Sequence, residues 1–301
     1  SIAFSRKRYL LAGLFAALAA LVKQSAAVAV PVMLIALVAS HNREGLARFI
    51  LGMIPAVAVL APFMLYNPAA FLYDVFQFHS TRVPQDLSLW AIPTHILGEH
   101  VVNIKILKSG WILPFAFSYI ALLAYLWRKR LWEKRGGIML ATALALLLFI
   151  IFGKIGNFDY LAWPLPLAIA GLYLTDRRRC IEVATLFSLA VVVAHVPYIT
   201  LLYLVPALLG RPIFVAEDLS FWPSTVLIET SLNSNLAELP LVKVINTADT
   251  DVVSTLNKTV KHVVNELYTL RGVLMSLAAV VGQIILTMIA IRMIRHSSIP
   301  A

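Results

Sequence analysis

Long apolar runs separated by short polar connections dominate this sequence. Eight such runs occur, at residues 9–22, 25–40, 46–66, 109–127, 136–152, 159–175, 181–209 and 272–291. The hydrocarbon core of a bilayer takes about 20 apolar residues as a helix, and fewer where the helix ends snorkel. The pattern therefore predicts an all-α, polytopic transmembrane helix bundle of about eight spans, formed as a single transmembrane domain by residues 1–301.

At two places in this pattern, an apolar run does not correspond simply to one membrane span. The runs 9–22 and 25–40 abut at Lys23-Gln24, an arrangement typical of a helical hairpin. The run 181–209 is too long for one crossing. His195 and Pro197 mark its expected exit from the membrane, and an interfacial helix is expected to follow over residues 198–209.

The distribution of charge predicts the orientation of these spans. Alternate connections hold 15 of the 25 Lys and Arg residues and carry a net charge of +11, whereas the remaining loops sum to −1. The basic set comprises residues 1–8, 41–48, 128–135, 176–182 and the segment after 291. Because Lys and Arg concentrate on the cytoplasmic side, the long loops 67–108 and 210–271 are predicted to be non-cytoplasmic and to contain interfacial helices.

Composition supports the same class of protein. Residues are 60% hydrophobic and 13% charged, and the mean hydropathy is +0.85, whereas soluble domains carry about 25% charged residues. We therefore expect an integral protein of a plasma or inner membrane, or of the endoplasmic reticulum. The pI of 9.8 is explained by the topology, so nucleic acid is not an expected partner.

Common nucleotide-binding and metal-binding motifs of enzymes are absent from the sequence. It has no Walker motif, no GxGxxG, no HExxH and no Cys/His metal cluster, so no metal site is predicted. Asp249 and Asp251 could bind a divalent cation, but ordinary solvated loop acids are the preferred interpretation, because two carboxylates alone are weak evidence for a cation site. The single cysteine, Cys180, lies in a basic connection and is expected to be a reduced thiol.

Lys23 and Gln24 form the first candidate site, because polar residues at membrane depth are costly and mark functional positions. The alternative is an ordinary hairpin turn in which Lys23 snorkels to the lipid interface.

The segment 67–90 supplies the second candidate. Aromatic residues precede His79 and Arg82, which are three positions apart and would share one face of an interfacial helix. Arg offers a fork suited to phosphate, and His can carry a proton. An aromatic belt with incidental polar neighbours is the alternative.

A third cluster occupies the short outer connection before residue 164. Lys154, Asp159 and Tyr160 crowd this connection, and two prolines open the next run. Lys154 could bind phosphate, or it could form a purely structural salt bridge with Asp159.

Three motifs, taken in order, resemble a known family. They are the helix–Lys23-Gln24–helix–Pro31 arrangement, FHSTRVPQDLSLW, and GKIGNFDYLAWPLPLAIA. Together they cover about half of the chain and are similar to C-type (GT-C) membrane glycosyltransferases that use polyprenyl- or dolichyl-phosphate sugars. The third motif resembles a segment of the aminoarabinose-transferase and protein-mannosyltransferase branches.

This resemblance implies a function and roles for individual residues. A sugar would pass from a polyprenyl- or dolichyl-phosphate carrier to an acceptor on the non-cytoplasmic face. Arg82 and Lys154 would hold the donor phosphate, Tyr160 would line its cleft, and Lys23-Gln24 would shape the cavity. The activity could be similar to that of a mannosyltransferase. The lipid-phosphate-linked sugar would be the donor, and a divalent cation could act as a cofactor.

One feature departs from the family pattern. These enzymes carry their catalytic Asp in the first outer loop, but no acidic residue lies between Ser1 and His41. The chain is therefore expected to be the carboxy-terminal, donor-binding portion, and no catalytic base is assigned. A transporter or flippase for an anionic substrate, or a non-catalytic membrane subunit, would suit the same polar residues.

Overall fold

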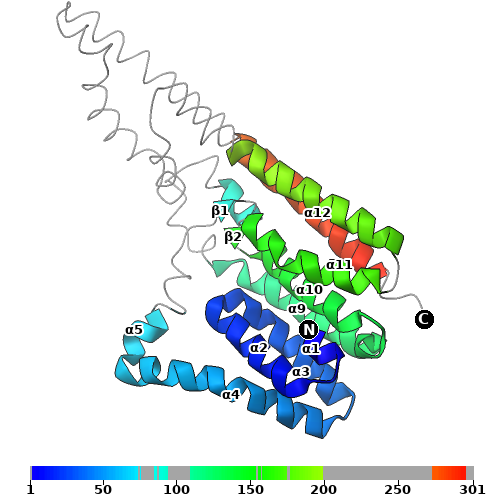
Figure 1. Ribbon diagram of the computed structural model, residues 1–301. Coiled ribbons are helices and arrows are strands. Elements are labelled where there is room, and N and C mark those ends of the chain that lie inside the picture. Colours follow the sequence, from blue (N-terminus) through cyan, green and yellow to red (C-terminus); the bar gives the residue numbers. More distant parts are fainter. Residues whose placement is uncertain are drawn as a thin grey trace, which may run out of the picture.

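The computed structural model describes residues 2–73, 75, 85–86, 88–93, 109–153, 155–156, 158–174, 177–198 and 273–295. Figure 1 shows helices packed side by side in this part of the chain. The α-helices are α1 Ile2–Ser5, α2 Tyr9–Val22, α3 Ala29–Ala39, α4 Arg43–Tyr66, α5 Pro68–Leu72, α9 Ile112–Lys129, α10 Gly137–Phe152, α11 Pro164–Tyr173, α12 Arg177–Tyr198 and a last described helix, Val273–Arg295. The 3-10 helices are η1 Gln24–Val28, η3 Leu89–Ala91, η5 Leu131–Glu133 and η6 Phe158–Ala162.

The described residues confirm the helical class and refine several boundaries. The run 9–22 forms α2 with the predicted ends, whereas α12 begins at Arg177, four residues before the apolar run 181–209. One pair of two-residue strands, β1 Gln85–Asp86 and β2 Ile155–Gly156, departs from the all-α prediction. Residues 199–209 of the expected interfacial helix and the loop 210–271 lie outside the described residues.

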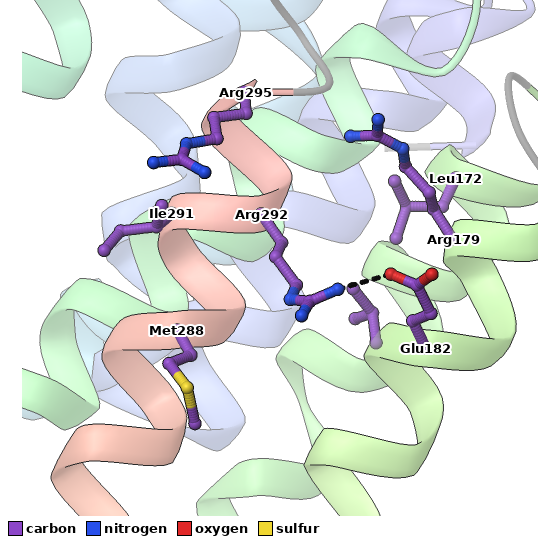
Figure 2. Close-up of a pocket in the computed structure, with 8 residues that line it drawn as sticks. Leu172, Arg179, Glu182, Met288, Ile291, Arg292 and Arg295 are labelled. Atoms are coloured by element: carbon purple, nitrogen blue, oxygen red, sulfur yellow. Dashed lines mark hydrogen bonds and ion pairs between the residues drawn. The ribbon is translucent and has the colours of Figure 1, made fainter.

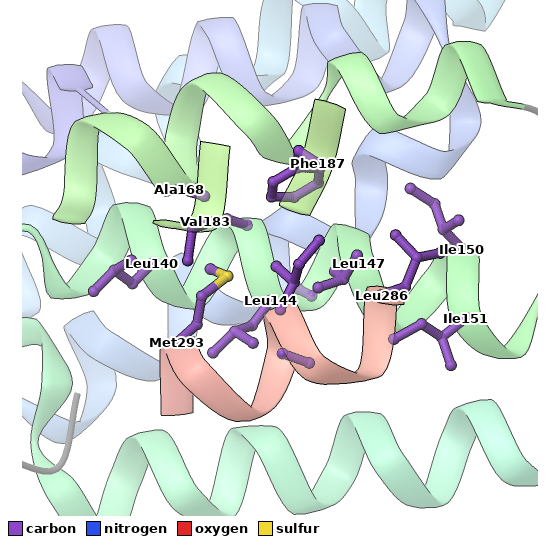
Figure 3. Close-up of a cluster of buried hydrophobic side chains, with 14 of the residues drawn as sticks. Leu140, Leu144, Leu147, Ile150, Ile151, Ala168, Val183, Phe187, Leu286 and Met293 are labelled. Atoms are coloured by element: carbon purple, nitrogen blue, oxygen red, sulfur yellow. The ribbon is translucent and has the colours of Figure 1, made fainter. Parts of the chain in front are cut away.

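Helix α10 is the centre of the packing. Its residues are hydrophobic on all sides, and those from Gly137 to Leu147 are buried, as expected for a helix surrounded by other helices. Figure 3 shows Leu144 and Leu147 of α10 against Phe187 of α12 and Leu286 of the last described helix. This cluster joins segments that are distant in the sequence into one apolar core.

Helices α2 and α4 pack through glycines. A Cβ atom on Gly13 would lie 1.9 Å from the carbonyl oxygen of Phe49, and one on Gly52 would lie 2.0 Å from that of Leu10. The two backbones therefore meet where neither helix has a side chain. Small residues that permit such an approach are typical of helix contacts within membranes.

Two helices in the described part of the chain are long and apolar enough to cross a membrane, judged by length and composition. They are α4 and Val273–Arg295, with mean hydropathies of 2.1 and 2.3. Only 17% of the apolar window in α4 is buried, and Val57, Phe63 and Leu65 are 57%, 64% and 82% exposed. Exposing such side chains to water costs about 25 cal/mol per Å² of apolar surface, so this face favours contact with lipid.

The bundle has two chemically different ends. At one end lie the starts of α2 and α4, the connection from α9 to α10, the start of α12 and the end of the last described helix. Contacts join these parts: Trp132 packs on the cluster that contains Phe4, and the Tyr125 hydroxyl donates to the carbonyl of Ile294. The described cations gather here: Arg6, Lys7, Arg8, Arg43, Arg48, Arg128, Lys129, Arg130, Lys134, Arg135, Arg178, Arg179, Arg292 and Arg295. We call this the basic end and the other the opposite end.

Candidate functional site

Lys23 is the one described cation at the opposite end, and it lies against two aromatic rings. Its Nζ atom is 4.8 Å from the centre of the Tyr160 ring and 5.7 Å from that of Trp163. The two rings are stacked with their centres 4.4 Å apart. A cation over an aromatic face gains about 0.5–1 kcal/mol at an exposed position. The ammonium is thus held in place while remaining exposed to a ligand.

Local sequence explains how these residues reach one another. Helix α2 ends at Lys23, whose extended backbone (φ −147°, ψ 113°) turns the chain into η1. Trp163 precedes α11, and Pro164 occupies the first position of that helix, where a missing N–H costs no hydrogen bond. The predicted role of the prolines as the start of a helix is confirmed.

The segment around Trp90 meets the end of α10. Strands β1 and β2 are parallel, with Gln85 opposite Ile155 and Asp86 opposite Gly156. Ser88 is fully buried, and its Oγ donates to the carbonyl of Gly153 at 2.8 Å. The indole Nε1 of Trp90 donates to the carbonyl of Phe152 at 3.2 Å. These bonds satisfy carbonyls that the end of a helix leaves without partners.

An aromatic wall extends from this point along α9. Phe115 lies edge-on to Phe149 at 5.7 Å and stacks on Tyr119 at 5.6 Å. The Tyr119 hydroxyl donates to the carbonyl of Val28, the last residue of η1. Next to Lys23, the buried Ser25 Oγ has no hydrogen-bond partner among the described residues. The opposite end thus combines one exposed cation, several aromatic faces and a free hydroxyl.

Three of the seven predicted site residues have described side chains. Lys23 and Tyr160 are in contact, and Gln24 is exposed beside them as the first residue of η1. Asp159 falls within η6, but its side chain lies outside the description. The predicted roles of His79, Arg82 and Lys154 stay predictions, because these residues lie outside the described ranges.

Several residues of the site were not predicted as site residues. Trp163 completes the aromatic pair, and Ser88 and Trp90 connect two loop segments that lie far apart in the sequence. The aromatic residues before the prolines of α11 were a usable signal for Trp163. No local pattern marks Ser88.

The described side chains favour binding of an anion with an apolar part. In the described ranges, no group of three His, Cys, Asp or Glu residues could hold a metal ion. Lys23 offers a positive charge, and the rings of Tyr160 and Trp163 offer apolar faces. Tyr and Trp combine an apolar ring with one polar group and are common at membrane interfaces. A lipid-linked phosphate has both required features.

Comparisons with known proteins identify no relative of this chain. No family model matches it, and neither the curated proteins nor the solved structures contain a significant match.

Proposed function

We propose that this protein is a membrane glycosyltransferase, or its donor-binding portion, that transfers a sugar from a polyprenyl-phosphate carrier on the non-cytoplasmic face. The observation that carries the proposal is the contact of Lys23 with the Tyr160–Trp163 pair. It joins two of the three motifs on which the resemblance to GT-C enzymes rests. The third motif ends at Trp90, which hydrogen-bonds to the end of α10 just before the Tyr160 motif.

The proposed topology is the eight-span bundle with the basic end in the cytoplasm. Support comes from the charge distribution, since all described cations except Lys23 gather at one end. The apolar surface of α4 agrees with a lipid environment. Lys23 and the Tyr160–Trp163 pair then belong to the non-cytoplasmic side.

Helix lengths support a position of this site below the outer membrane surface. At a rise of 1.5 Å per residue, the 14 residues of α2 span about 21 Å, whereas the 24 residues of α4 span about 36 Å. Both helices start at the basic end and pack side by side. Lys23, at the end of the shorter helix, would therefore lie within the apolar layer, where the phosphate of a membrane-embedded carrier can meet it.

The short distance along the chain to the strand pair would allow Arg82 and Lys154 to bind the donor phosphate together with Lys23. Arg82 precedes Gln85 by three residues, and Lys154 immediately precedes Ile155, the partner of Gln85 in the strand pair. Consecutive Cα atoms are about 3.8 Å apart, so the chain from Gln85 back to Arg82 spans at most about 11 Å. We propose that both cations bind the same donor phosphate.

The chemistry follows from charge. When the sugar leaves, the carrier phosphate gains negative charge, and fixed cations in a low-dielectric cleft stabilise that change. In this proposal the Tyr160–Trp163 pair prevents the Lys23 ammonium from swinging away into lipid headgroups. The rings also offer an apolar surface for the first isoprene units of the carrier.

Binding of a polyprenyl phosphate to the purified chain in nanodiscs tests the proposal. Lys23→Ala should weaken binding about ten-fold or more, because a hydrogen bond to a charged group contributes about 1.5–3 kcal/mol. Lys23→Arg keeps the charge and the aromatic contact, so it should bind nearly as the wild type does. Trp163→Leu keeps apolar bulk but removes one ring, and it should weaken binding less than Lys23→Ala.

Lys129→Ala is the matched control, since Lys129 is an exposed cation at the basic end. Equal loss of binding in the Lys23 and Lys129 variants would show a general charge effect and contradict the assignment of the site. Movement of the carrier across the membrane, with no sugar transfer by any longer form of the protein, would instead indicate a transporter or flippase.

A further inference from the structure

A cavity of about 510 Å³ lies at the basic end, far from the site described above. It is bounded by α12 and the last described helix, with one residue of α11 at its edge (Figure 2). Its lining consists of Leu172, Arg179, Glu182, Val183, Met288, Ile291, Arg292 and Arg295. The proposed transfer reaction uses none of these residues.

Helical spacing explains why these side chains share one cavity. On the last described helix, Met288, Arg292 and Arg295 are four and three residues apart and therefore occupy one face. On α12, Glu182 and Val183 follow Arg179 by three and four residues, so both lie on the same face as Arg179. The two faces are joined across the cavity by the ion pair of Arg292 with Glu182, drawn as a dashed line in Figure 2.

The lining carries an excess of positive charge. It contains three guanidinium groups and one carboxylate. Arg292 and Glu182 form an ion pair, and the lining as a whole carries two more positive than negative charges. A guanidinium presents a planar fork of donors that matches the oxygens of a phosphate. The cavity is therefore complementary to an anion.

The other lining residues of the same cavity are apolar. Met288 lies seven residues before Arg295, which corresponds to about 10 Å along the helix axis. Ile291, Val183 and Leu172 complete this apolar part. A soluble anion such as inorganic phosphate would leave these side chains unused. An amphiphile with a phosphate and acyl chains would contact both parts.

We propose that this cavity binds an anionic phospholipid of the cytoplasmic leaflet, with its phosphate at Arg179 and Arg295 and the first part of an acyl chain along Met288. The proposal rests on the membrane orientation given above but not on sugar transfer. Basic pockets between transmembrane helices on the cytoplasmic side are suited to anionic headgroups. The lipid would connect α12 to the last described helix, and so stabilise their packing.

The test uses the full purified chain after removal of native lipid. Native mass spectrometry and the midpoint temperature of thermal unfolding measure the binding of phosphatidylglycerol. Phosphatidylcholine and inorganic phosphate are tested in parallel in the same two assays. Phosphatidylglycerol should bind and raise the midpoint, while the other two should leave it unchanged. Arg295→Gln should weaken phosphatidylglycerol binding about ten-fold, because it removes one charge-assisted contact.

Two controls make the result specific. Arg295 and Arg128 are both exposed arginines at the basic end, but only Arg295 lines the cavity, so Arg128→Gln should bind phosphatidylglycerol as the wild type does. Lys23→Ala should also leave this binding unchanged, and Arg295→Gln should leave polyprenyl-phosphate binding unchanged, which separates the two proposals. An equal response to phosphatidylcholine or to inorganic phosphate would overturn the assignment of an anionic lipid. Loss of binding in both arginine variants, or in neither, would overturn the assignment of the cavity.

Discussion

Replacing Gly13 by alanine tests the close contact of α2 with α4. The new Cβ atom would lie 1.9 Å from the carbonyl oxygen of Phe49, and Cβ contacts below 3.0 Å essentially never occur. The two helices must therefore separate by about 1 Å, because both clashing groups belong to helix backbones and cannot rotate away. Such a shift loosens the packing along the whole contact.

The expected magnitude can be separated from the intrinsic preference of alanine for helices. Helix propensity alone would make Gly13→Ala stabilising by about 0.5–1 kcal/mol. Overpacking costs about 1–3 kcal/mol, and the clash here is with backbone, so we expect a net loss near 2 kcal/mol. Gly52→Ala should behave alike, since its Cβ atom would lie 2.0 Å from the carbonyl of Leu10. The double variant should cost less than the sum, because one separation relieves both clashes.

Reversible unfolding of the purified chain in detergent or bicelles measures these changes. Ala19→Gly, on the exposed face of α2, calibrates the backbone effect without altering the contact. A stabilising Gly13→Ala, or strictly additive single variants, would refute the close packing of α2 on α4.

Two further predictions concern topology and the site. The topology is tested with single cysteines introduced into a variant whose Cys180 is replaced by serine. Cysteines within 84–100 and 230–255 should react with an impermeant reagent from outside sealed cells, whereas those within 128–135 should not react. Labelling of 128–135 would contradict the orientation. Ser88→Ala should lower the free energy of unfolding by about 1–2 kcal/mol, because the buried Gly153 carbonyl loses its donor. In the same unfolding assay, Ser188→Ala on the exposed face of α12 should change little, and an equal loss there would argue against a special role for Ser88.

The sequence predicted helix ends correctly where a charged residue interrupts an apolar run at the same position as the helix begins or ends. Arg8 and Lys23 interrupt an apolar run, and α2 begins and ends beside them. At α12 the prediction placed the start too late, because Arg177 and its neighbours are compatible with helix even though they end the apolar run. At α12, the apolar run therefore marks the start of the helix too late.

The candidate site could be predicted only in part for a similar reason. Lys23 was predicted as a site residue because polar residues between two apolar runs are costly, and Tyr160 because it belongs to a short polar connection within a motif that resembles the GT-C family. Their contact, and that of Lys23 with Trp163, depends on the packing of η1 and η6 against the same helix, α10, which no local pattern encodes. The strand pair was missed because two residues are too short to show an alternating pattern.

Photo-crosslinking with a polyprenyl phosphate that carries a photoreactive group beside its phosphate tests the central claim most directly. We expect adducts in the peptides around Lys23, Trp90 and Trp163. These adducts should be lost when unlabelled polyprenyl phosphate is added and should be reduced in Lys23→Ala. Adducts confined to the cavity lined by Arg179 and Arg295, or adducts that unlabelled carrier does not displace, would contradict a donor site at the opposite end.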